Sequence, residues 1–158
     1  MHIRPVEKQD RAPLAALLAA TENFTPQEVA VALELIDSAL EHPEKDEYWV
    51  QVAEEGGPIV GYVCYGPTPM TDRTFDLYWV AVHPSKRGQG IGKALTSHVE
   101  ALLRAKTARL LLIETASKES YQATRRFYLD QGYREVARIK DFYADGDDRV
   151  IYAKRLDR

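Results

Sequence analysis

Cysteine is almost absent from this chain of 158 residues, since Cys64 is its only one. A lone cysteine cannot form an intrachain disulfide, and it cannot supply a zinc site built from cysteine ligands. The residues around it are apolar, which favours a buried thiol over a reactive one, because reactive thiols need a polar and electropositive setting. We therefore expect neither a disulfide nor a metal centre.

Long apolar runs are missing as well. No stretch approaches the roughly 18 apolar residues that a membrane span requires. The first residues, Met1 to Pro5, also lack the apolar region of a secretory signal. We therefore expect a cytoplasmic protein that does not associate with a membrane.

Positive charge is not in excess. The chain has 21 lysine and arginine residues against 24 aspartate and glutamate residues, which gives a net charge of -3. A slightly acidic chain without a basic stripe is a poor partner for a nucleic-acid backbone. Its 45% apolar and 28% charged residues are ordinary globular values, and no low-complexity tract or linker divides it. The sequence therefore predicts one domain over residues 1–158 that does not bind nucleic acid.

Helical periodicity marks four segments of the chain. Thr25-Pro26-Gln27-Glu28 has the residues of a capping box with proline at the first helical position, and His42-Pro43 ends the helix that follows. Asp10 is placed to cap an earlier helix. Two later helices are expected from Ile91 to Leu103 and from about Ser120 to Asp130, the second with Gly132 as its C-terminal cap.

Runs of β-branched and aromatic residues mark the strands. A first strand is expected within residues 1–6, a hairpin from residues 48–53 and 59–65, and a central strand over residues 75–82. The apolar run at residues 110–113 follows a helix, so strand, helix and strand predict a right-handed crossover and a parallel pair. A final hairpin is expected from residues 133–143 and 150–154.

A glycine-rich joint, residues 83–93, connects the strand at 75–82 to the next helix. Such a joint exposes N–H groups at the positive end of a helix dipole, where a phosphate is stabilised. Two common phosphate motifs do not fit it. The P-loop pattern requires glycine at Arg87 and serine or threonine at Ala94. The dinucleotide-binding pattern requires a further glycine at Lys93.

The joint does match Arg87-x-x-Gly90-x-Gly92, the Arg/Gln-x-x-Gly-x-Gly/Ala pattern of acetyltransferases that bind acyl-CoA. With the strand before it, the helix after it and the later Phe127-Tyr128-x-x-x-Gly132-Tyr133, the chain resembles the GNAT superfamily of N-acetyltransferases along nearly its whole length. The resemblance implies an α/β (α+β) fold in three layers, with a mixed, mostly antiparallel sheet of six to seven strands, a splayed parallel pair and about four helices. It also implies acetyl-CoA-dependent transfer of an acetyl group directly to a primary amine.

The same resemblance assigns the coenzyme site. Backbone amides of the joint are expected to surround the coenzyme A pyrophosphate, and the strand at Val80 to Val82 is expected to splay from its parallel neighbour so that its backbone pairs with the pantetheine arm. Many family members carry asparagine where Tyr121 stands, so its contact with the coenzyme stays open. The expected coenzyme-binding residues are Val80, Ala81, Val82, Arg87, Gly88, Gln89, Gly90, Ile91, Gly92, Lys93, Tyr121 and Phe127.

The resemblance also points to three catalytic candidates. Tyr128 occupies the place of the family tyrosine near the thioester sulfur, where a phenol donates to the departing thiolate as general acid. Asp76 resembles the catalytic glutamate of histone-type members in position, and Glu114 resembles the glutamate of the ribosomal-protein alanine acetyltransferases. Each carboxylate is about as well explained by a structural role as by catalysis. The position of Glu114 at a strand end slightly favours it as the base.

The acceptor is expected to contact the first two helices and the last hairpin, with Phe24, Asp141 and Tyr143 as candidate contacts. Acidic and aromatic side chains there favour a cation. A protein amino terminus, a lysine side chain and a small amine are all compatible with this composition. A non-catalytic acyl-CoA-binding sensor is the alternative function, and a partner-binding protein that has abandoned the coenzyme is a third. The final hairpin is apolar enough to pair with a second copy, which leaves a homodimer open.

Overall fold

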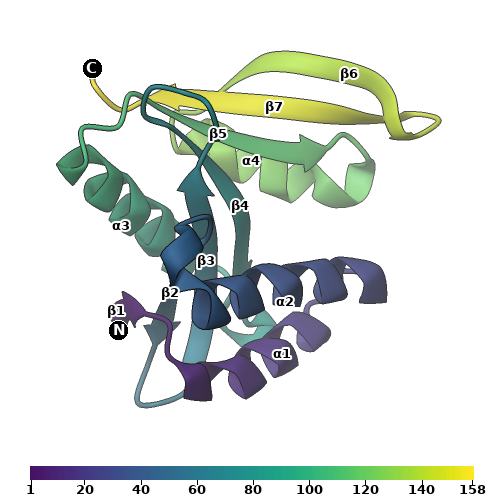
Figure 1. Cartoon of the computed structure of the whole chain (residues 1–158). Coiled ribbons are helices and arrows are strands. Elements are labelled where there is room, and N and C mark those ends of the chain that lie inside the picture. The colour runs from purple at the N-terminus through teal and green to yellow at the C-terminus, as the bar shows by residue number, and fades with distance from the viewer. The chain divides into compact units, whose positions relative to one another are not determined.

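Seven strands form one mixed sheet in the order β1-β2-β3-β4-β5-β7-β6, accompanied by four α-helices, in a computed structural model that describes residues 1–158 (Figure 1). This confirms the expected fold class. The chain falls into two units, the first comprising Met1–Pro67 and Tyr78–Leu102 and the second comprising Thr68–Leu77 and Leu103–Arg158. The division passes through strand β4 (Thr74–Val82) and helix α3 (Ile91–Ala105).

The strands of the first unit that precede β4 run antiparallel to their neighbours. They form the expected hairpin, because the N–H of Glu55 donates to the carbonyl oxygen of Pro58 at 3.0 Å across the turn. Cys64 is fully buried, as its apolar surroundings predict. The three strands are β1 (His2–Pro5), β2 (Trp49–Glu54) and β3 (Ile59–Pro67).

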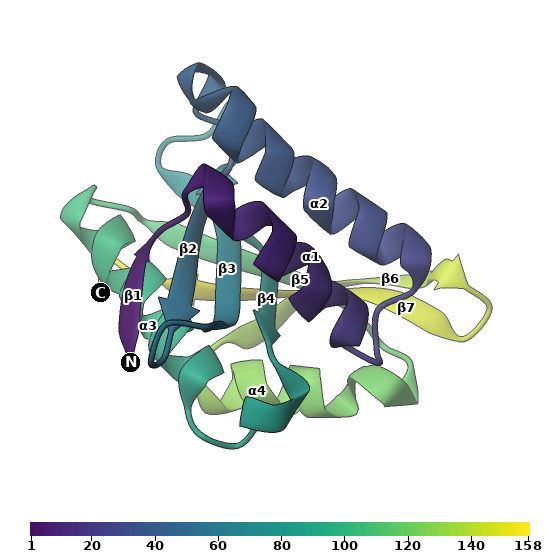
Figure 2. The same ribbon diagram turned by 90° about the horizontal axis from the view of Figure 1, so that it is seen from below.

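Helices α1 (Arg11–Ala20) and α2 (Pro26–Glu41) lie side by side over one face of these strands (Figure 2). The predicted capping box of α2 is confirmed: the Thr25 hydroxyl accepts from the N–H of Glu28 at 3.1 Å, and the Glu28 carboxylate accepts from the N–H of Thr25 at 3.3 Å. The apolar sides of both helices and the sheet share one core, whose buried members are Leu14, Leu17, Leu18, Ala32, Ile36, Val50, Val52, Tyr62, Cys64 and Ala81.

Asp10 does not cap α1 with its side chain, so that prediction was wrong. Instead, its carboxylate accepts from the N–H of Glu7 at 2.7 Å and from the guanidinium of Arg4 at 2.8 and 2.9 Å. Asp10 ends a 3-10 turn, Lys8–Asp10, and is only 3% exposed. The local pattern does not reveal this arrangement because the arginine comes from β1.

Helix α3 covers the other face of the first unit's strands. Gly61 of β3 permits its close approach, since a Cβ there would lie 3.0 Å from the carbonyl oxygen of Ala81 and 3.1 Å from the side chain of Ile91. Leu95 and Val99 of α3 are fully buried. Glycine at position 61 therefore decides how closely the beginning of α3 lies against the sheet.

The predicted parallel pair lies in the second unit. Thr74 lies opposite Leu110, and the pairing continues to Leu77 opposite Ile113. β7 pairs antiparallel with both β5 and β6, which confirms the final hairpin, with a second strand longer than expected. The strands are β5 (Leu110–Ala116), β6 (Arg134–Ala144) and β7 (Asp147–Arg155).

Helix α4 (Gln122–Asp130) lies along one face of these strands (Figure 1). It begins after Ser120 because a 3-10 turn, Glu119–Tyr121, precedes it. Gly132 has a φ of 90° and its N–H donates to the carbonyl oxygen of Leu129 at 3.1 Å, which confirms the predicted cap. The other 3-10 turns are Pro43–Lys45 and Pro84–Lys86.

Strand β6 is the terminal strand of the sheet order and is exposed along its whole length. The outer edge of β6, at which a second copy of the chain could pair, is therefore accessible. Each helix is either too short or too polar to cross a membrane.

Candidate active site

The glycine-rich joint begins with a 3-10 turn, Pro84–Lys86, and continues through two left-handed glycines. Gly88 and Gly90 have φ values of 75° and 79°. Residues with a Cβ rarely adopt this conformation, so glycine is strongly preferred at both positions. A Cβ at either position would meet nothing within 4 Å, which means that conformation rather than space selects glycine. Gly92, by contrast, lies in the first turn of α3.

The beginning of α3 leaves backbone donors without helical partners. The N–H of Ala94 donates to the carbonyl oxygen of Gly90 at 2.9 Å, which is the first hydrogen bond of the helix. The N–H groups of Ile91, Gly92 and Lys93 precede that bond and point out of the helix end. Together with the helix dipole they favour an anion at this end of α3.

The joint is anchored to the hairpin formed by β2 and β3. The N–H of His83 donates to the carbonyl oxygen of Val60 at 2.8 Å, and Lys86 Nζ donates to the Glu55 carboxylate at 2.9 Å. The ammonium group of Lys86 lowers the pKa of Glu55 by hydrogen bonding and charge. The positive charge of Lys86 is therefore paired within the protein, whereas the side chain of Arg87 is exposed at the joint.

Tyr128 is buried in α4, with 5% of its surface exposed. Its ring packs edge-on against the rings of Phe127 and Tyr133, with centroid separations of 5.2 and 5.9 Å. Burial raises the pKa of the Tyr128 phenol because a phenolate is poorly solvated there. The side chain is therefore a neutral hydroxyl, and a hydrogen-bond donor, at physiological pH.

Asp76 lies half-buried on β4, opposite Leu112 of the parallel neighbour. The hydroxyl of Thr68 donates to its Oδ2 at 2.7 Å. Burial raises the pKa of Asp76 and the Glu114 carboxylate acts in the same direction, while the Thr68 hydrogen bond and the charge of Arg149 oppose them. A carboxylate with a raised pKa is a better proton acceptor than an ordinary surface aspartate.

Glu114 is held by an arginine that the sequence did not single out. Arg149 Nε donates to Glu114 Oε2 at 3.0 Å, and Arg149 Nη2 donates to Glu114 Oε1. The same guanidinium lies 5.1 Å from the centre of the Phe142 ring. Asp76 and Arg149 also influence each other through charge. Asp76, Glu114 and Arg149 therefore form one charged cluster in the second unit.

The candidate acceptor contacts belong to different units. Phe24 is in the first unit, where its ring packs edge-on against Trp79 at a centroid separation of 5.3 Å. Asp141 and Tyr143 are on β6 in the second unit. The Asp141 carboxylate accepts from the N–H of Gly146 at 2.8 Å, so it stabilises the tip of the hairpin. Tyr143 is 49% exposed.

The remaining expected coenzyme contacts are divided in the same way. Val80, Ala81 and Val82 end β4 in the first unit. Tyr121 precedes α4 in the second unit, with Lys118 Nζ 5.1 Å from the centre of its ring, and Phe127 contacts Tyr128. The pairs between β4 and β5 run from Thr74 to Leu77, and the splay beyond them stays a prediction.

Comparison with known proteins points to one family. The sequence profile described as "Acetyltransferase (GNAT) domain" matches residues 44–135, a range that includes the glycine-rich joint and the three catalytic candidates. A crystal structure of a protein assigned to the GNAT family from Desulfovibrio desulfuricans is 40% identical to this chain, with a TM-score of 0.95 and coverage of 98% of each chain.

Two further relatives extend the comparison. The yncA protein of Salmonella typhimurium, solved with its cofactor acetyl-CoA, shares the fold at 23% identity, with a TM-score of 0.75 and coverage of 100% of this chain and 95% of that chain. N-acetyltransferase 8B of Mus musculus is 33% identical over 92 residues, which are 56% of this chain and 38% of that protein. The match therefore spans less than half of that relative's length.

Proposed function

The chain belongs to the GNAT acetyltransferase family, and we propose that it transfers an acetyl group from acetyl-CoA directly to a primary amine. The observation that carries the proposal is the beginning of α3, where two left-handed glycines lead to N–H groups without helical partners. When bound, acetyl-CoA supplies an activated acetyl thioester. The remaining functions are binding, orientation and proton handling, and they fall to residues of this chain.

The glycine-rich joint is proposed to hold the coenzyme. Its backbone N–H groups from Gly88 to Lys93 face the pyrophosphate, and the side chains of Arg87 and Lys93 add positive charge. Backbone groups of Val80 to Val82 pair with the amides of the pantetheine arm, and Tyr121 and Phe127 line it. Lys86 fixes the position of the joint through its ion pair.

Asp76 is proposed to accept the proton of the amine. A free alkylamine is mostly protonated at neutral pH and must lose a proton before it attacks the thioester. Asp76 has the raised pKa that this role requires, whereas both oxygens of Glu114 are occupied by Arg149. These contacts support Asp76 as the base in place of Glu114, which the sequence slightly favours. Glu114 then positions Arg149.

Tyr128 is proposed to donate a hydrogen bond to the sulfur of the departing coenzyme. Its pKa is raised by burial, while an ordinary thiol has a pKa of about 8.5. Full transfer of the phenolic proton to the thiolate is therefore uphill. We therefore assign Tyr128 the role of a hydrogen-bond donor that stabilises the negative charge developing on the sulfur. The proton that completes the thiol comes from the amine, through Asp76 or solvent.

The acceptor is proposed to be a cationic amine before its deprotonation. Tyr143 is 49% exposed next to Phe142, whose ring already contacts Arg149. An exposed ring covers the apolar stem of an amine while attracting its charge. A protein amino terminus, a lysine side chain and a small amine all have this chemistry. A non-catalytic acyl-CoA-binding sensor is the alternative, against which the buried donor Tyr128 and the half-buried Asp76 count.

The decisive experiment incubates the chain with acetyl-CoA and a library of small amines, lysine-containing peptides and peptides with free amino termini. Thiol release and the mass of the acetylated product are measured together. We expect one acceptor class to turn over. Acetyl-CoA binding without thiol release for any amine would favour the sensor, and absence of acetyl-CoA binding would overturn the proposal.

A further inference from the structure

Strand β6 carries a large bulge near the tip of the final hairpin. Ile139 of β6 lies opposite Arg149 of β7, and the next pair along the strands is Ala144 opposite Asp147. Residues 140–143 therefore lie opposite a single residue of β7, and we call them the β6 bulge. Most bulges insert one extra residue. The N–H groups of a larger bulge lose the partners that a regular strand pair supplies, so they need others.

Asp148 is the single residue opposite the bulge, and its carboxylate supplies such a partner. Oδ1 accepts from the N–H of Asp141 at 2.9 Å, and Oδ2 accepts from Arg138 Nη1 at 2.9 Å. The N–H of Asp141 and, after it, the guanidinium of Arg138 lower the pKa of Asp148, so the carboxylate is charged at neutral pH. A side-chain oxygen thus replaces the strand carbonyl that the N–H of Asp141 would meet in a regular ladder.

The bulge is also anchored at the tip of the hairpin and to the loop after β5. Asp141 has a left-handed backbone with a φ of 55°, and its carboxylate accepts from the N–H of Gly146 at 2.8 Å. The N–H of Asp148 donates to Ser117 Oγ at 2.6 Å, and the carbonyl oxygen of Asp148 accepts from the N–H of Ser117 at 3.0 Å. Asp148 is therefore fixed by its own backbone while its side chain holds the bulge.

The bulge brings two aromatic rings to the charged cluster. The guanidinium carbon of Arg149 lies 5.1 Å from the centre of the Phe142 ring, and Arg149 also holds Glu114. Tyr143 packs edge-on against Phe142 at a centroid separation of 4.9 Å and is 49% exposed. The conformation of the bulge therefore decides where the exposed ring of Tyr143 lies relative to the cluster.

The proposed base lies on the same face of the sheet as this contact. Paired residues on neighbouring strands share a face, and so do residues two apart along one strand. Asp76 pairs with Leu112, and Glu114, two residues further along β5, is bonded to Arg149. An acceptor whose amine reaches Asp76 therefore lies over the face to which the bulge adds its aromatic rings.

We propose that Asp148 is a positioning residue for the acceptor: it holds the β6 bulge so that Tyr143 contacts the acceptor beside Arg149. This inference rests on the proposed function, because the contact requires an acceptor. Asp148 acts through Tyr143 and touches no reacting atom, since both of its carboxylate oxygens accept from donors of the protein. Loss of its side chain should therefore weaken acceptor binding without slowing the transfer step.

The test is Asp148→Ala, which removes both carboxylate oxygens. Hydrogen exchange of the Asp141 amide, followed by NMR on the ¹⁵N-labelled full chain, should become about tenfold faster or more because the amide loses its partner. KM for the acceptor identified by the library should rise about tenfold, as expected for the loss of one good contact. The value of kcat and the affinity for acetyl-CoA should stay within about twofold of the wild type.

Two further variants of Asp148 sharpen the test. Asp148→Asn keeps an oxygen for the N–H of Asp141, and Arg138 still has Glu135 as a partner at 2.9 Å. It should recover most of the acceptor affinity, with KM within about threefold of the wild type. Asp148→Thr favours a strand, but its shorter side chain loses both contacts, so it should reproduce the effects of Asp148→Ala if the alanine variant folds poorly.

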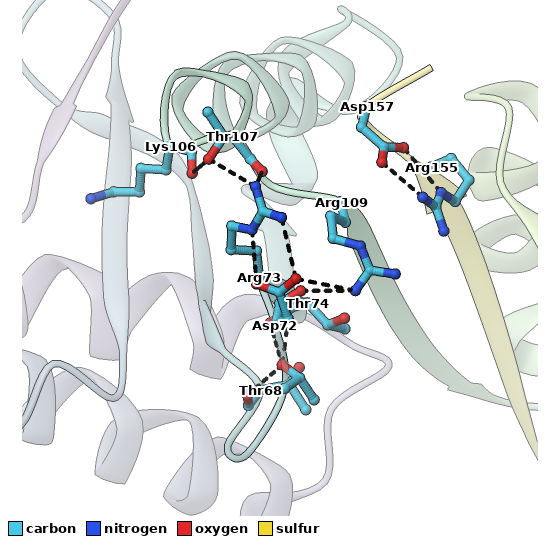
Figure 3. Close-up of polar contacts among 10 residues, drawn as sticks. Thr68, Asp72, Arg73, Thr74, Lys106, Thr107, Arg109, Arg155 and Asp157 are labelled. Carbon is cyan, nitrogen blue, oxygen red and sulfur yellow. Dashed lines mark hydrogen bonds and ion pairs between the residues drawn. The ribbon is translucent and has the colours of Figure 1, made fainter.

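Asp157→Ala is the matched control. Asp157 follows β7 and is held by Arg155 at 3.0 and 2.8 Å, so the variant breaks another aspartate–arginine pair of the same hairpin strand (Figure 3). KM for the acceptor and exchange at Asp141 should both stay within about twofold of the wild type. Urea unfolding of all variants shows whether any change in KM follows from lost stability.

Three results would overturn the proposal. The first is unchanged exchange at Asp141 in the folded alanine or threonine variant, which would show that Asp148 does not hold the bulge. The second is faster exchange with an unchanged KM, which would separate the bulge from the acceptor. The third is an equal rise of KM in Asp157→Ala. Failure of the proposed function gives a different result, because the wild type itself would then release no thiol.

Discussion

Glu114 and Arg149 meet diagonally across strands β5 and β7. Glu114 lies opposite Ile151 and Arg149 lies opposite Ala116, yet Arg149 Nε reaches Glu114 Oε2 at 3.0 Å. Diagonal neighbours in an antiparallel pair lie within reach of long side chains. This contact removes Glu114 from the set of free carboxylates and places a fixed positive charge where it lowers the pKa of Asp76.

Replacing Arg149 with methionine should move the acidic limb of the pH–rate profile to higher pH. The change removes a charge that lowers the pKa of Asp76 and leaves Glu114, which raises it, without its partner. Asp76 would then remain protonated, and inactive as a base, up to a higher pH. The profile of kcat/KM against pH measures this. Arg134→Met on β6 removes the same charge from an exposed position and should leave the limb in place. Equal shifts in both variants would argue against a local effect.

Asp76→Asn should abolish the acidic limb and lower kcat/KM about 10²-fold to 10⁴-fold, because that is the usual contribution of a general base. Glu114→Gln should keep the limb, although its position shifts to lower pH because one carboxylate that raises the pKa of Asp76 is gone. Both pH profiles are measured with the acceptor found by the library. Loss of the limb in Glu114→Gln alone would return the role of base to Glu114.

Thr68→Val should raise the pKa of Asp76 further, since the hydroxyl of Thr68 stabilises the charged carboxylate at 2.7 Å. The acidic limb should therefore move to higher pH. Thr71→Val is the matched control, because Thr71 donates to the carbonyl oxygen of Thr68 and supports the same turn without touching Asp76. A shift of equal size in the control would assign the effect to the turn as a whole.

The backbone of the joint was predictable because its signal is local. The spacing of Gly88, Gly90 and Gly92 with a strand before and a helix after predicts an anion site, and the structure adds that only the first two need positive φ. The parallel pair was also predictable, since a crossover through a helix restricts its direction. Local residue patterns were therefore sufficient to predict these parts of the fold.

The charged cluster was not predictable because it depends on register. Arg149 meets Glu114 through the pairing of β5 with β7, and no pattern within β7 distinguishes Arg149 from the chain's other arginines. Thr68 was similarly hidden in a turn that predicts only the end of a strand. Asp10 failed as a cap for the same reason: its partner Arg4 lies on another element. In each case a partner on another strand, helix or turn decides what the carboxylate contacts, and the residues next to the carboxylate do not reveal that partner.

Gly90→Ala should weaken acetyl-CoA binding about tenfold, because alanine resists the left-handed conformation that directs the N–H groups of the joint. Gly56→Ala is a matched control: Gly56 has a φ of 64° and, like Gly90, open space for a Cβ, but it lies in the turn between β2 and β3. Both variants should lose about 1 kcal/mol of unfolding free energy. Isothermal calorimetry and urea unfolding separate the two effects. Equal coenzyme affinity in both variants would contradict the assignment.

Asp10→Asn should lower the free energy of unfolding by about 2 kcal/mol at neutral pH, because it weakens charged hydrogen bonds with a buried partner. The pKa of folded Asp10 is lowered, chiefly by the hydrogen bond from Arg4. Its stabilisation is therefore complete above the unfolded pKa of about 3.9 and disappears as pH falls through the lower folded value. Urea unfolding of both proteins near neutrality and near about pH 3 should show the difference between them shrinking in acid. Asp37→Asn, which breaks the more exposed pair with Arg11, should cost less at neutral pH. A difference between wild type and Asp10→Asn that stays constant with pH would mean that the lost stability comes from packing and not from the charge of Asp10.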